Sequence, residues 1–231
     1  MNCVVLGDGL LGSEIIKQTD WDYISRKKNG IDAVNFEQWS NLLQNYDTII
    51  NCIGFTKTYE NNQKDSWNLN VVFVNQLVDY CNNNSKKLVH ISTDYLYAGS
   101  VPNATENDVP IPVNTWYGYS KLVGDGIVQL NSKNHLVCRL SHKPNPFPYD
   151  SAWSDIHTNC DFADVISSLV IQLVNKNANG VFNVGTELKS IYDLAKKSKH
   201  EIKKINKPSH VPNDISMNLD KLKHFLNDGN N

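Results

Sequence analysis

The chain has 231 residues, of which 40% are hydrophobic and 20% charged, with a formal net charge of -2. This length suits one domain, or one large domain that carries a small appendage. The near-neutral charge gives no electrostatic reason to expect binding to nucleic acid or to an anionic membrane, and no apolar run approaches the roughly 20 residues that a membrane helix needs.

The N-terminal residues and the cysteines bear on the cellular compartment. Residues 1–7 lack a basic region and reach a glycine too early for a signal peptide, so we expect a cytoplasmic protein. The five cysteines show no CxxC spacing, and three of them lie in apolar, strand-like runs. Such cysteines are more often small buried side chains than disulfide partners or metal ligands, so we expect no metal site.

The chain opens with a predicted strand over residues 2–6, a glycine-rich turn over residues 7–12 and a helix that continues to residue 19. The turn reads Gly-Asp-Gly-Leu-Leu-Gly, a GxGxxG pattern. Between a strand and a helix this pattern indicates a dinucleotide site, because the glycines let the backbone approach a pyrophosphate at the helix N-terminus. A glycine-rich turn without a ligand is the alternative.

The second predicted strand, residues 22–25, ends at Ser25 and is followed by Arg26. A site for NAD usually has an acidic residue at this place, where it accepts from the ribose hydroxyls. A hydroxyl and a guanidinium suit a 2′-phosphate instead, so we expect NADP, with a solvated basic loop as the alternative. Asp32 lies where a carboxylate could accept from the adenine amino group.

Helices and strands then alternate along the chain. We expect helices over residues 36–46, 66–81, 115–130, 160–176, 187–198 and 216–226, and strands over residues 47–54, 87–92, 135–140 and 180–184. This alternation gives βαβ units and hence a parallel sheet with right-handed crossovers. The predicted fold class is therefore α/β, a Rossmann doubly wound parallel sheet.

Tyr117 and Lys121 lie four residues apart on a predicted helix, so both side chains share one face. A nearby ammonium group lowers the pKa of a phenol from its usual value of about 10, which makes Tyr117 a candidate general acid or base. A surface tyrosine–lysine pair is the alternative. The catalytic interpretation is favoured because Thr93 follows the fourth strand at its carboxyl end, where open α/β sheets bind ligands.

Together these motifs resemble the extended short-chain dehydrogenase/reductase family, and within it the dTDP-4-dehydrorhamnose reductase branch. The resemblance rests on residues 7–12, 47–52, 92–99 and 117–122 and is dense from residue 1 to about residue 141. It implies that Tyr117 donates a proton, that Lys121 binds the nicotinamide ribose and lowers the pKa of Tyr117, and that Thr93 hydrogen-bonds the substrate oxygen. Related dehydratases carry a Glu or an Asp-Glu pair after this threonine, so the Asp94-Tyr95 sequence disfavours dehydration.

The chain departs from the family pattern in its C-terminal part. His142 stands about where the family has a tryptophan near the sugar, and Trp153 is our candidate to replace that aromatic side chain. The interval between residues 140 and 161 is also shorter than in the family. We therefore expect residues 1–141 to form an NADP-binding Rossmann domain, and residues 142–231 a small, shortened C-terminal substrate-binding lobe that is interleaved with the sheet.

The expected site residues fall into three groups. The catalytic residues are Thr93, Tyr117 and Lys121. The residues expected to bind the cofactor are Gly7, Gly9, Leu10, Leu11, Gly12, Ser25, Arg26, Asp32, Ile53, Gly54, Tyr117 and Lys121. The residues expected to bind the substrate are Thr93, Asp94, Tyr95, His142 and Trp153.

The function that the resemblance implies is NADPH-dependent reduction of a nucleotide-linked 4-keto-6-deoxysugar. One alternative is an epimerase or epimerase-reductase on the same scaffold, and another is a non-catalytic, NADP-binding regulatory subunit. The presence of Thr93, Tyr117 and Lys121 favours an enzyme, whereas the shortened lobe favours a regulatory subunit. The expected partner is a nucleotide-sugar, with no nucleic acid and no membrane, and a homodimer is left open.

Overall fold

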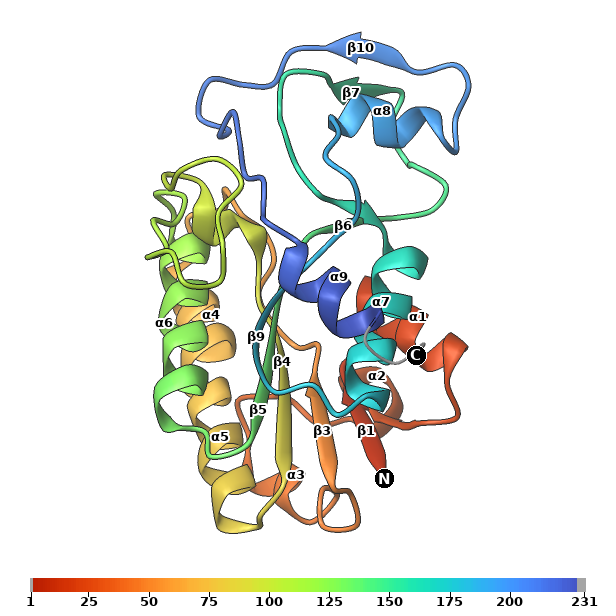
Figure 1. The fold of residues 1–231 in the computed structure, drawn as a ribbon. Coiled ribbons are helices and arrows are strands. Elements are labelled where there is room, and N and C mark those ends of the chain that lie inside the picture. Colours follow the sequence, from red (N-terminus) through yellow and green to blue (C-terminus); the bar gives the residue numbers. More distant parts are fainter. Residues whose placement is uncertain (1, 228–231) are drawn as a thin grey trace.

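Six parallel strands form the central sheet in this computed structural model, which describes residues 2–227 (Figure 1). In sheet order the strands are β2 (Asp22–Ile24), β1 (Cys3–Leu6), β3 (Thr48–Asn51), β4 (Lys87–Ile91), β5 (His135–Leu140) and β9 (Gly180–Val184). All neighbouring pairs in this sheet are parallel. The predicted doubly wound parallel sheet is thus confirmed. The strand order reverses between β1 and β3, the point at which such sheets bind ligands.

Helices cover both faces of the sheet because successive strand residues point to opposite sides (Figure 1). Val5 and Ile50 pack with α1 (Leu10–Gln18), α7 (Ala163–Asn175) and α9 (Asp220–Asn227). Val4 and Ile49 face the other way, toward α3 (Glu37–Ser40), α5 (Phe73–Asn83) and α6 (Trp116–Asn131). Burial on both faces explains why these strands read as continuous apolar runs.

The helix predicted over residues 66–81 starts earlier and changes its pitch in the middle. It consists of α4 (Gln63–Trp67), a π-helical segment η1 (Asn68–Val72) and α5. Asn70 lies in the π segment, where it is buried against the loop after β3. A Cβ atom on Gly124 of α6 would overlap the Asn70 carbonyl oxygen, so the two helices pack very closely at this level. Insertions of this type are frequent near functional sites.

Several shorter elements differ from the predicted ones. The helix predicted over residues 36–46 is reduced to α3 and a series of turns, although Trp39 and Leu43 are buried as their spacing indicated. Ser25 starts an unpredicted short helix, α2 (Arg26–Asn29). The helix predicted from residue 160 begins after a short strand, β8 (Asp161–Phe162).

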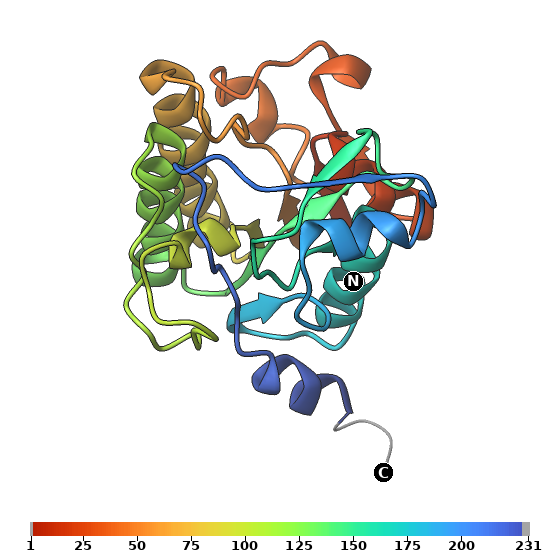
Figure 2. The same ribbon diagram turned by 90° about the horizontal axis from the view of Figure 1, so that it is seen from above.

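The C-terminal part of the chain divides between the sheet and a small lobe above its carboxyl edge (Figure 1). In the lobe, β7 (Ser151–Trp153) pairs in parallel with β10 (Lys203–Ile205), and α8 (Ile191–Lys196) packs beside them. The strand β6 (His142–Lys143) pairs with β8 at the base of the lobe. In the view from above, the chain after β10 crosses toward α6 before it returns to α9 (Figure 2).

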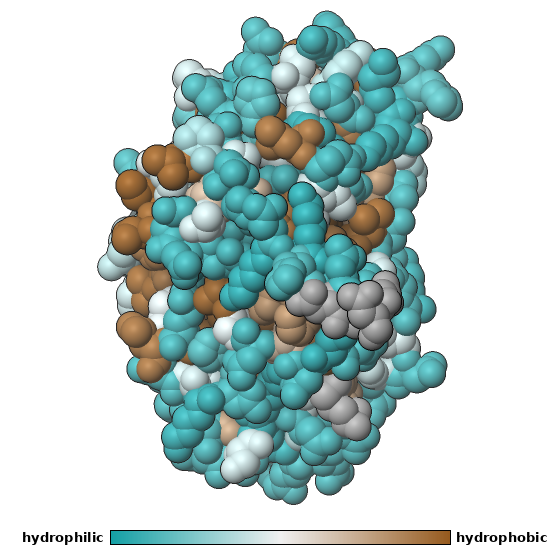
Figure 3. Space-filling model, in the orientation of Figure 1, coloured by the Kyte–Doolittle hydropathy of each residue, from teal (hydrophilic) through white to brown (hydrophobic). Residues whose placement is uncertain are grey.

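The surface is mostly hydrophilic on the face shown in Figure 3, with hydrophobic groups along the side where α6 and the loop after β4 lie. Exposed hydrophobic residues of these two segments include Val109, Ile111 and Leu130. Within residues 2–227, no helix combines the length and the apolar character that crossing a membrane requires.

Candidate active site

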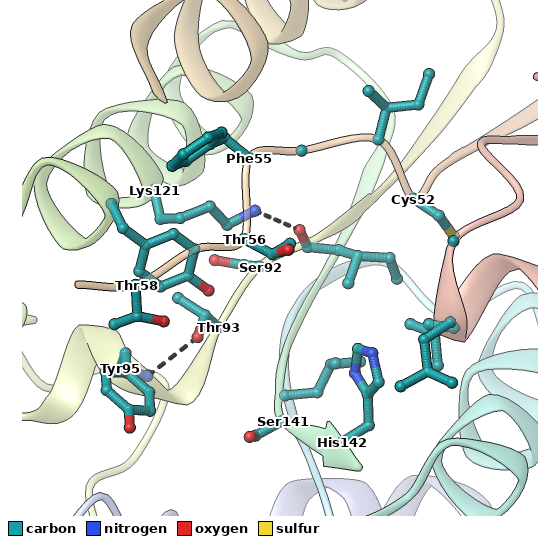
Figure 4. A pocket seen from close by; sticks show the side chains of 18 of the residues that line it. Cys52, Phe55, Thr56, Thr58, Ser92, Thr93, Tyr95, Lys121, Ser141 and His142 are labelled. Carbon is teal, nitrogen blue, oxygen red and sulfur yellow. Dashed lines mark hydrogen bonds between the residues drawn. The ribbon is translucent and has the colours of Figure 1, made fainter. Parts of the chain in front are cut away.

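A cavity of about 410 Å³ opens at the carboxyl edge of the sheet, beside the point where the strand order reverses (Figure 4). This volume is within the range of small-molecule sites, roughly 300–1,000 Å³. Its walls come from residues 9–12, 52–56, 58, 91–93, 95, 117, 121 and 140–143. The glycine turn, the loop after β3, the end of β4, α6 and the segment after β5 therefore meet at one place.

The glycine turn is shaped for close approach by a ligand. A Cβ atom on Gly12 would overlap the Gly7 carbonyl oxygen, so the fold itself requires Gly12. Gly9 differs, because a Cβ atom there would meet nothing within 4 Å beyond its own neighbours in the described part of the chain. Gly9 is also the N-cap of α1 and brings no side-chain oxygen to the N–H groups of the first turn. The N–H donors of this first turn and the positive end of the helix dipole suit a pyrophosphate.

The residues predicted to bind the 2′-phosphate and the adenine are not part of the lining of this cavity. The Ser25 hydroxyl oxygen accepts from the Lys28 N–H at 3.0 Å and so caps α2, while its own O–H is still a donor, and its assignment to a phosphate stays a prediction. The Arg26 guanidinium lies 3.6 Å from the Asp32 carboxylate, and their side chains are 80% and 48% exposed. An exposed pair of this kind is weak and can open for a ligand. The assignments of Arg26 and Asp32 stay predictions.

Tyr117 and Lys121 both reach the cavity from α6, whose first turn is capped by the Thr115 hydroxyl. Burial raises the pKa of Tyr117 to about 12, with a smaller lowering by the Thr93 hydroxyl and a raising effect of the Asp94 charge. Lys121 Nζ donates to the Ile91 carbonyl oxygen at 2.7 Å (Figure 4), and burial lowers the pKa of Lys121 to about 8. Burial is the largest influence on the Tyr117 pKa and Lys121 is not among its causes, so the expected lowering by Lys121 stays a prediction.

Three consecutive residues after β4 were predicted to bind substrate, and the structure separates them. Thr93 and Tyr95 line the cavity, and the Thr93 hydroxyl oxygen accepts from the Tyr95 N–H at 3.2 Å (Figure 4). The Tyr95 and Tyr117 rings contact edge to face, with centroids 6.5 Å apart. Asp94 is fully buried behind the cavity wall, because the 3₁₀ helix η2 (Asp94–Tyr97) turns its side chain inward. Direct contact between Asp94 and a substrate therefore lacks support.

The two predicted substrate residues of the C-terminal part also differ in position. His142 lines the cavity (Figure 4), where burial lowers its pKa to about 4, so the imidazole is neutral at pH 7. Trp153 instead packs against the core of the lobe, because β7 is fixed there by its pairing with β10. The prediction that Trp153 replaces an aromatic contact to the sugar is not supported by this position.

Several cavity residues were missed by the sequence interpretation. Phe55, Thr56 and Thr58 follow β3, whereas Ser141 and Lys143 follow β5 (Figure 4 labels all but Lys143). Their signal was their place directly after the carboxyl ends of two buried strands, where ligands bind in open sheets.

Asn70 holds the loop after β3 against α6. Its side-chain oxygen accepts from the Phe55 N–H at 2.9 Å, and its amide donates to the Phe55 carbonyl oxygen at 3.2 Å and to the Ser120 hydroxyl at 3.0 Å. Phe55 lines the cavity, and Ser120 lies between the two α6 residues of the site. Asn70 thus fixes one cavity wall relative to Tyr117 and Lys121.

A buried ion pair joins strand β5 to helix α6 next to the cavity. Arg139 of β5 donates to the Asp125 carboxylate of α6 at 2.9 and 3.1 Å and to the Tyr97 hydroxyl at 2.6 Å. Ser92, which lines the cavity, donates to the same carboxylate at 2.6 Å. Among residues 2–227 no cluster of His, Cys, Asp or Glu side chains is suited to hold a metal ion.

Residues 1–142 match the model of the family described as "RmlD substrate binding domain". A probable low-salt glycan biosynthesis reductase, Agl14 of Haloferax volcanii, is 31% identical over 116 residues, or 48% of this chain and 38% of the relative. Methionine adenosyltransferase 2 subunit beta of Xenopus laevis is 31% identical over 111 residues, or 48% of this chain and 30% of the relative. The matches thus cover less than half of either relative.

A dTDP-4-dehydrorhamnose reductase from Bacillus anthracis, solved in complex with NADP, superposes with a TM-score of 0.81. The superposition covers 96% of this chain and 91% of that structure at 21% identity, which shows a shared fold. The family match spans more than half of the sequence. The protein therefore belongs to the RmlD substrate binding domain family, which confirms the relationship to dTDP-4-dehydrorhamnose reductases inferred from its motifs.

Proposed function

We propose that the protein is an NADP-dependent reductase that acts on the ketone of a nucleotide-linked 4-keto-6-deoxysugar. The observation that carries this proposal is the cavity at the β1/β3 switch point. There the glycine turn, Thr93, Tyr117 and Lys121 converge from separate parts of the chain. The resemblance of the motifs to a reductase branch supports the same chemistry.

The cavity residues have different roles in the proposed ketone reduction. NADPH held at the glycine turn would supply the hydride for the ketone carbon, and negative charge would develop on the substrate oxygen. Tyr117, whose raised pKa keeps it protonated at neutral pH, donates its proton to that oxygen. Thr93 donates a hydrogen bond to the same oxygen and stabilises the developing charge. The Lys121 ammonium adds a positive charge in the same wall and is available to a ribose hydroxyl.

The cofactor assignment draws on the turn and on a related structure. Gly9 leaves open space at the start of α1, as a pyrophosphate requires. The related reductase from Bacillus anthracis was solved with NADP. We propose that residues 1–141 hold the cofactor and that residues 142–231 shape the substrate site through residues such as His142 and Lys143. A homodimer stays a prediction.

The test is NADPH oxidation on addition of dTDP-4-dehydrorhamnose, followed by the loss of NADPH absorbance. Wild-type protein should consume NADPH, and Tyr117→Phe should lose turnover while it still binds NADPH. Turnover by Tyr117→Phe at the wild-type rate would remove Tyr117 from the role of proton donor. Absence of turnover with any nucleotide-linked keto-deoxysugar would contradict the proposed reaction.

A non-catalytic, NADP-binding regulatory subunit is the second candidate. The observation that favours it is the partial likeness to methionine adenosyltransferase 2 subunit beta. In that case NADP should still bind and Tyr117→Phe should change nothing measurable. A stable complex with a separate catalytic protein would then appear on size-exclusion chromatography.

A further inference from the structure

Asp94 is a fully buried carboxyl group placed between the cavity wall and the lobe. The Thr93 hydroxyl donates to its Oδ1 at 3.4 Å, and the Thr158 hydroxyl donates to its Oδ2 at 3.3 Å. Both contacts are longer than the usual O–H···O distance of about 2.7 Å, so they compensate poorly for lost hydration. Burial accordingly raises the pKa of Asp94 to about 7, against the opposing effects of Lys143 and of the two hydroxyls.

The two carboxyl oxygens of Asp94 have different partners. Thr158 is fixed in the lobe, because its backbone N–H and carbonyl both pair with Lys189 at 3.0 Å. Its hydroxyl oxygen accepts from the Cys160 N–H at 3.0 Å, and its single hydrogen is directed at Asp94 Oδ2. Because Oδ2 is thereby kept as an acceptor, a proton taken up by Asp94 resides on Oδ1, beside Thr93.

The Thr93 hydroxyl has one hydrogen and two lone pairs, and one lone pair already accepts from the Tyr95 N–H (Figure 4). When Asp94 is ionised, the single hydrogen of Thr93 is drawn to Oδ1. When Asp94 is protonated, Oδ1–H donates to the second lone pair of Thr93. The Thr93 hydrogen is then released toward the cavity, where it is able to bond a substrate oxygen.

We propose that Asp94 is a positioning residue whose uncharged form turns the Thr93 hydroxyl hydrogen toward the substrate, with Thr158 of the lobe fixing which carboxyl oxygen takes the proton. This inference rests on the proposed function, in which Thr93 is a hydrogen-bond donor. A charged Asp94 is unfavourable for a second reason, because its charge raises the pKa of Tyr117 and makes the phenol a weaker acid.

The titratable groups that interact electrostatically with Asp94 come from its own helix η2 and from three surrounding segments. They are Lys143 of β6, Tyr95 of η2, Tyr117 of α6 and Cys160 of the lobe. Burial raises the pKa of the two tyrosines and of the cysteine, so these three stay neutral near pH 7. Lys143 is the cation of the group and opposes the rise of the Asp94 pKa.

The test compares the pH dependence of kcat, measured with NADPH and dTDP-4-dehydrorhamnose, in three proteins. With an Asp94 pKa of about 7, wild-type kcat at pH 8 should be about one-tenth of its value at pH 6. In Asp94→Asn the side chain is neutral at every pH, so this tenfold fall should disappear and leave only the smaller fall caused by titration of Lys121, whose pKa is about 8. Thr158→Val removes a bond that stabilises the charge, so the fall should move to higher pH. A wild-type ratio in Asp94→Asn, or a shift to lower pH in Thr158→Val, would overturn the inference.

A readout that needs no turnover separates this inference from the proposed function. The folded-state pKa of Asp94 is about 7 and exceeds the unfolded value of about 3.9, so wild-type stability is lost as pH rises between these values. The Tm of Asp94→Asn relative to wild type should therefore increase from pH 5 to pH 8. In Thr158→Val the Asp94 pKa is higher, so the loss of stability that Asp94 causes should continue to higher pH than in wild type. A Tm difference that is the same at both pH values would overturn the inference even if the sugar is reduced.

Discussion

The buried ion pair of Asp125 and Arg139 allows a quantitative stability prediction. The side chains of Arg139 and Asp125 are 2% and 1% exposed, and the pair is bidentate. Asp125→Asn keeps the shape but leaves the guanidinium buried without a counter-ion. Breaking a buried pair in this way costs about 3–5 kcal/mol. Because Tyr97 still accepts from Arg139 and the amide oxygen still accepts one bond, we expect the lower end, about 3 kcal/mol, in urea unfolding at pH 7.

An exposed pair provides the matched control. Lys17 Nζ lies 2.6 Å from Glu14 Oε1, closer than the buried pair, but the side chains are 67% and 21% exposed. Water and salt screen such a pair, so Glu14→Gln should cost at most about 0.5 kcal/mol. The different burial of the two pairs, rather than their N···O distances, accounts for the expected difference in the loss of unfolding free energy. A loss below about 1 kcal/mol in Asp125→Asn, or a loss equal to that of the control, would refute the reasoning.

Three further changes test other parts of the structure. Gly12→Ala forces a Cβ atom onto the Gly7 carbonyl oxygen, so the unfolding free energy measured in urea should fall by about 3 kcal/mol. An unchanged urea midpoint would contradict the close approach of residues 7 and 12. The pKa of Lys121 is about 8 in the folded protein and lies below its unfolded value. The stability of wild type relative to Lys121→Met should therefore rise from about pH 8 to about pH 10.5. A stability difference between the two proteins that stays constant over that range would contradict the burial argument. Arg26→Ala should weaken NADPH binding, by fluorescence titration, far more than NADH binding; equal effects would argue against a role at the 2′-phosphate.

Periodicity in the sequence located the strands because each is buried on both faces and reads as an apolar run. The strand at residues 180–184 coincides with β9 for this reason. The π segment around Asn70 was not predictable, because it depends on contacts with Phe55 and Ser120 that come from distant parts of the chain. Likewise, the spacing of Trp39 and Leu43 indicated burial correctly but fits successive turns as well as a continuous helix.

The site was predictable where a sequence motif fixes both the position of a residue in the fold and the direction of its side chain or backbone. The GxGxxG turn and the spacing of Tyr117 and Lys121 brought these residues to one cavity. Asp94 was misplaced because it was grouped with its neighbours Thr93 and Tyr95, whose side chains line the cavity, whereas its own side chain is fully buried. Trp153 was misplaced because its partner strand, β10, was not anticipated in a segment rich in lysine.

In the proposed function the turn before α1 holds a dinucleotide, and Gly9→Val tests this binding most directly. A Cβ atom at Gly9 meets nothing within 4 Å among the described residues beyond its own neighbours, so the variant should fold with a Tm close to that of wild type. Gly126→Ala on α6 is the control, because its Cβ atom is equally free of such contacts and the residue lies outside the cavity. We predict that Gly9→Val weakens NADPH binding at least about tenfold while Gly126→Ala does not. Equal NADPH affinity in wild type and Gly9→Val would contradict the account.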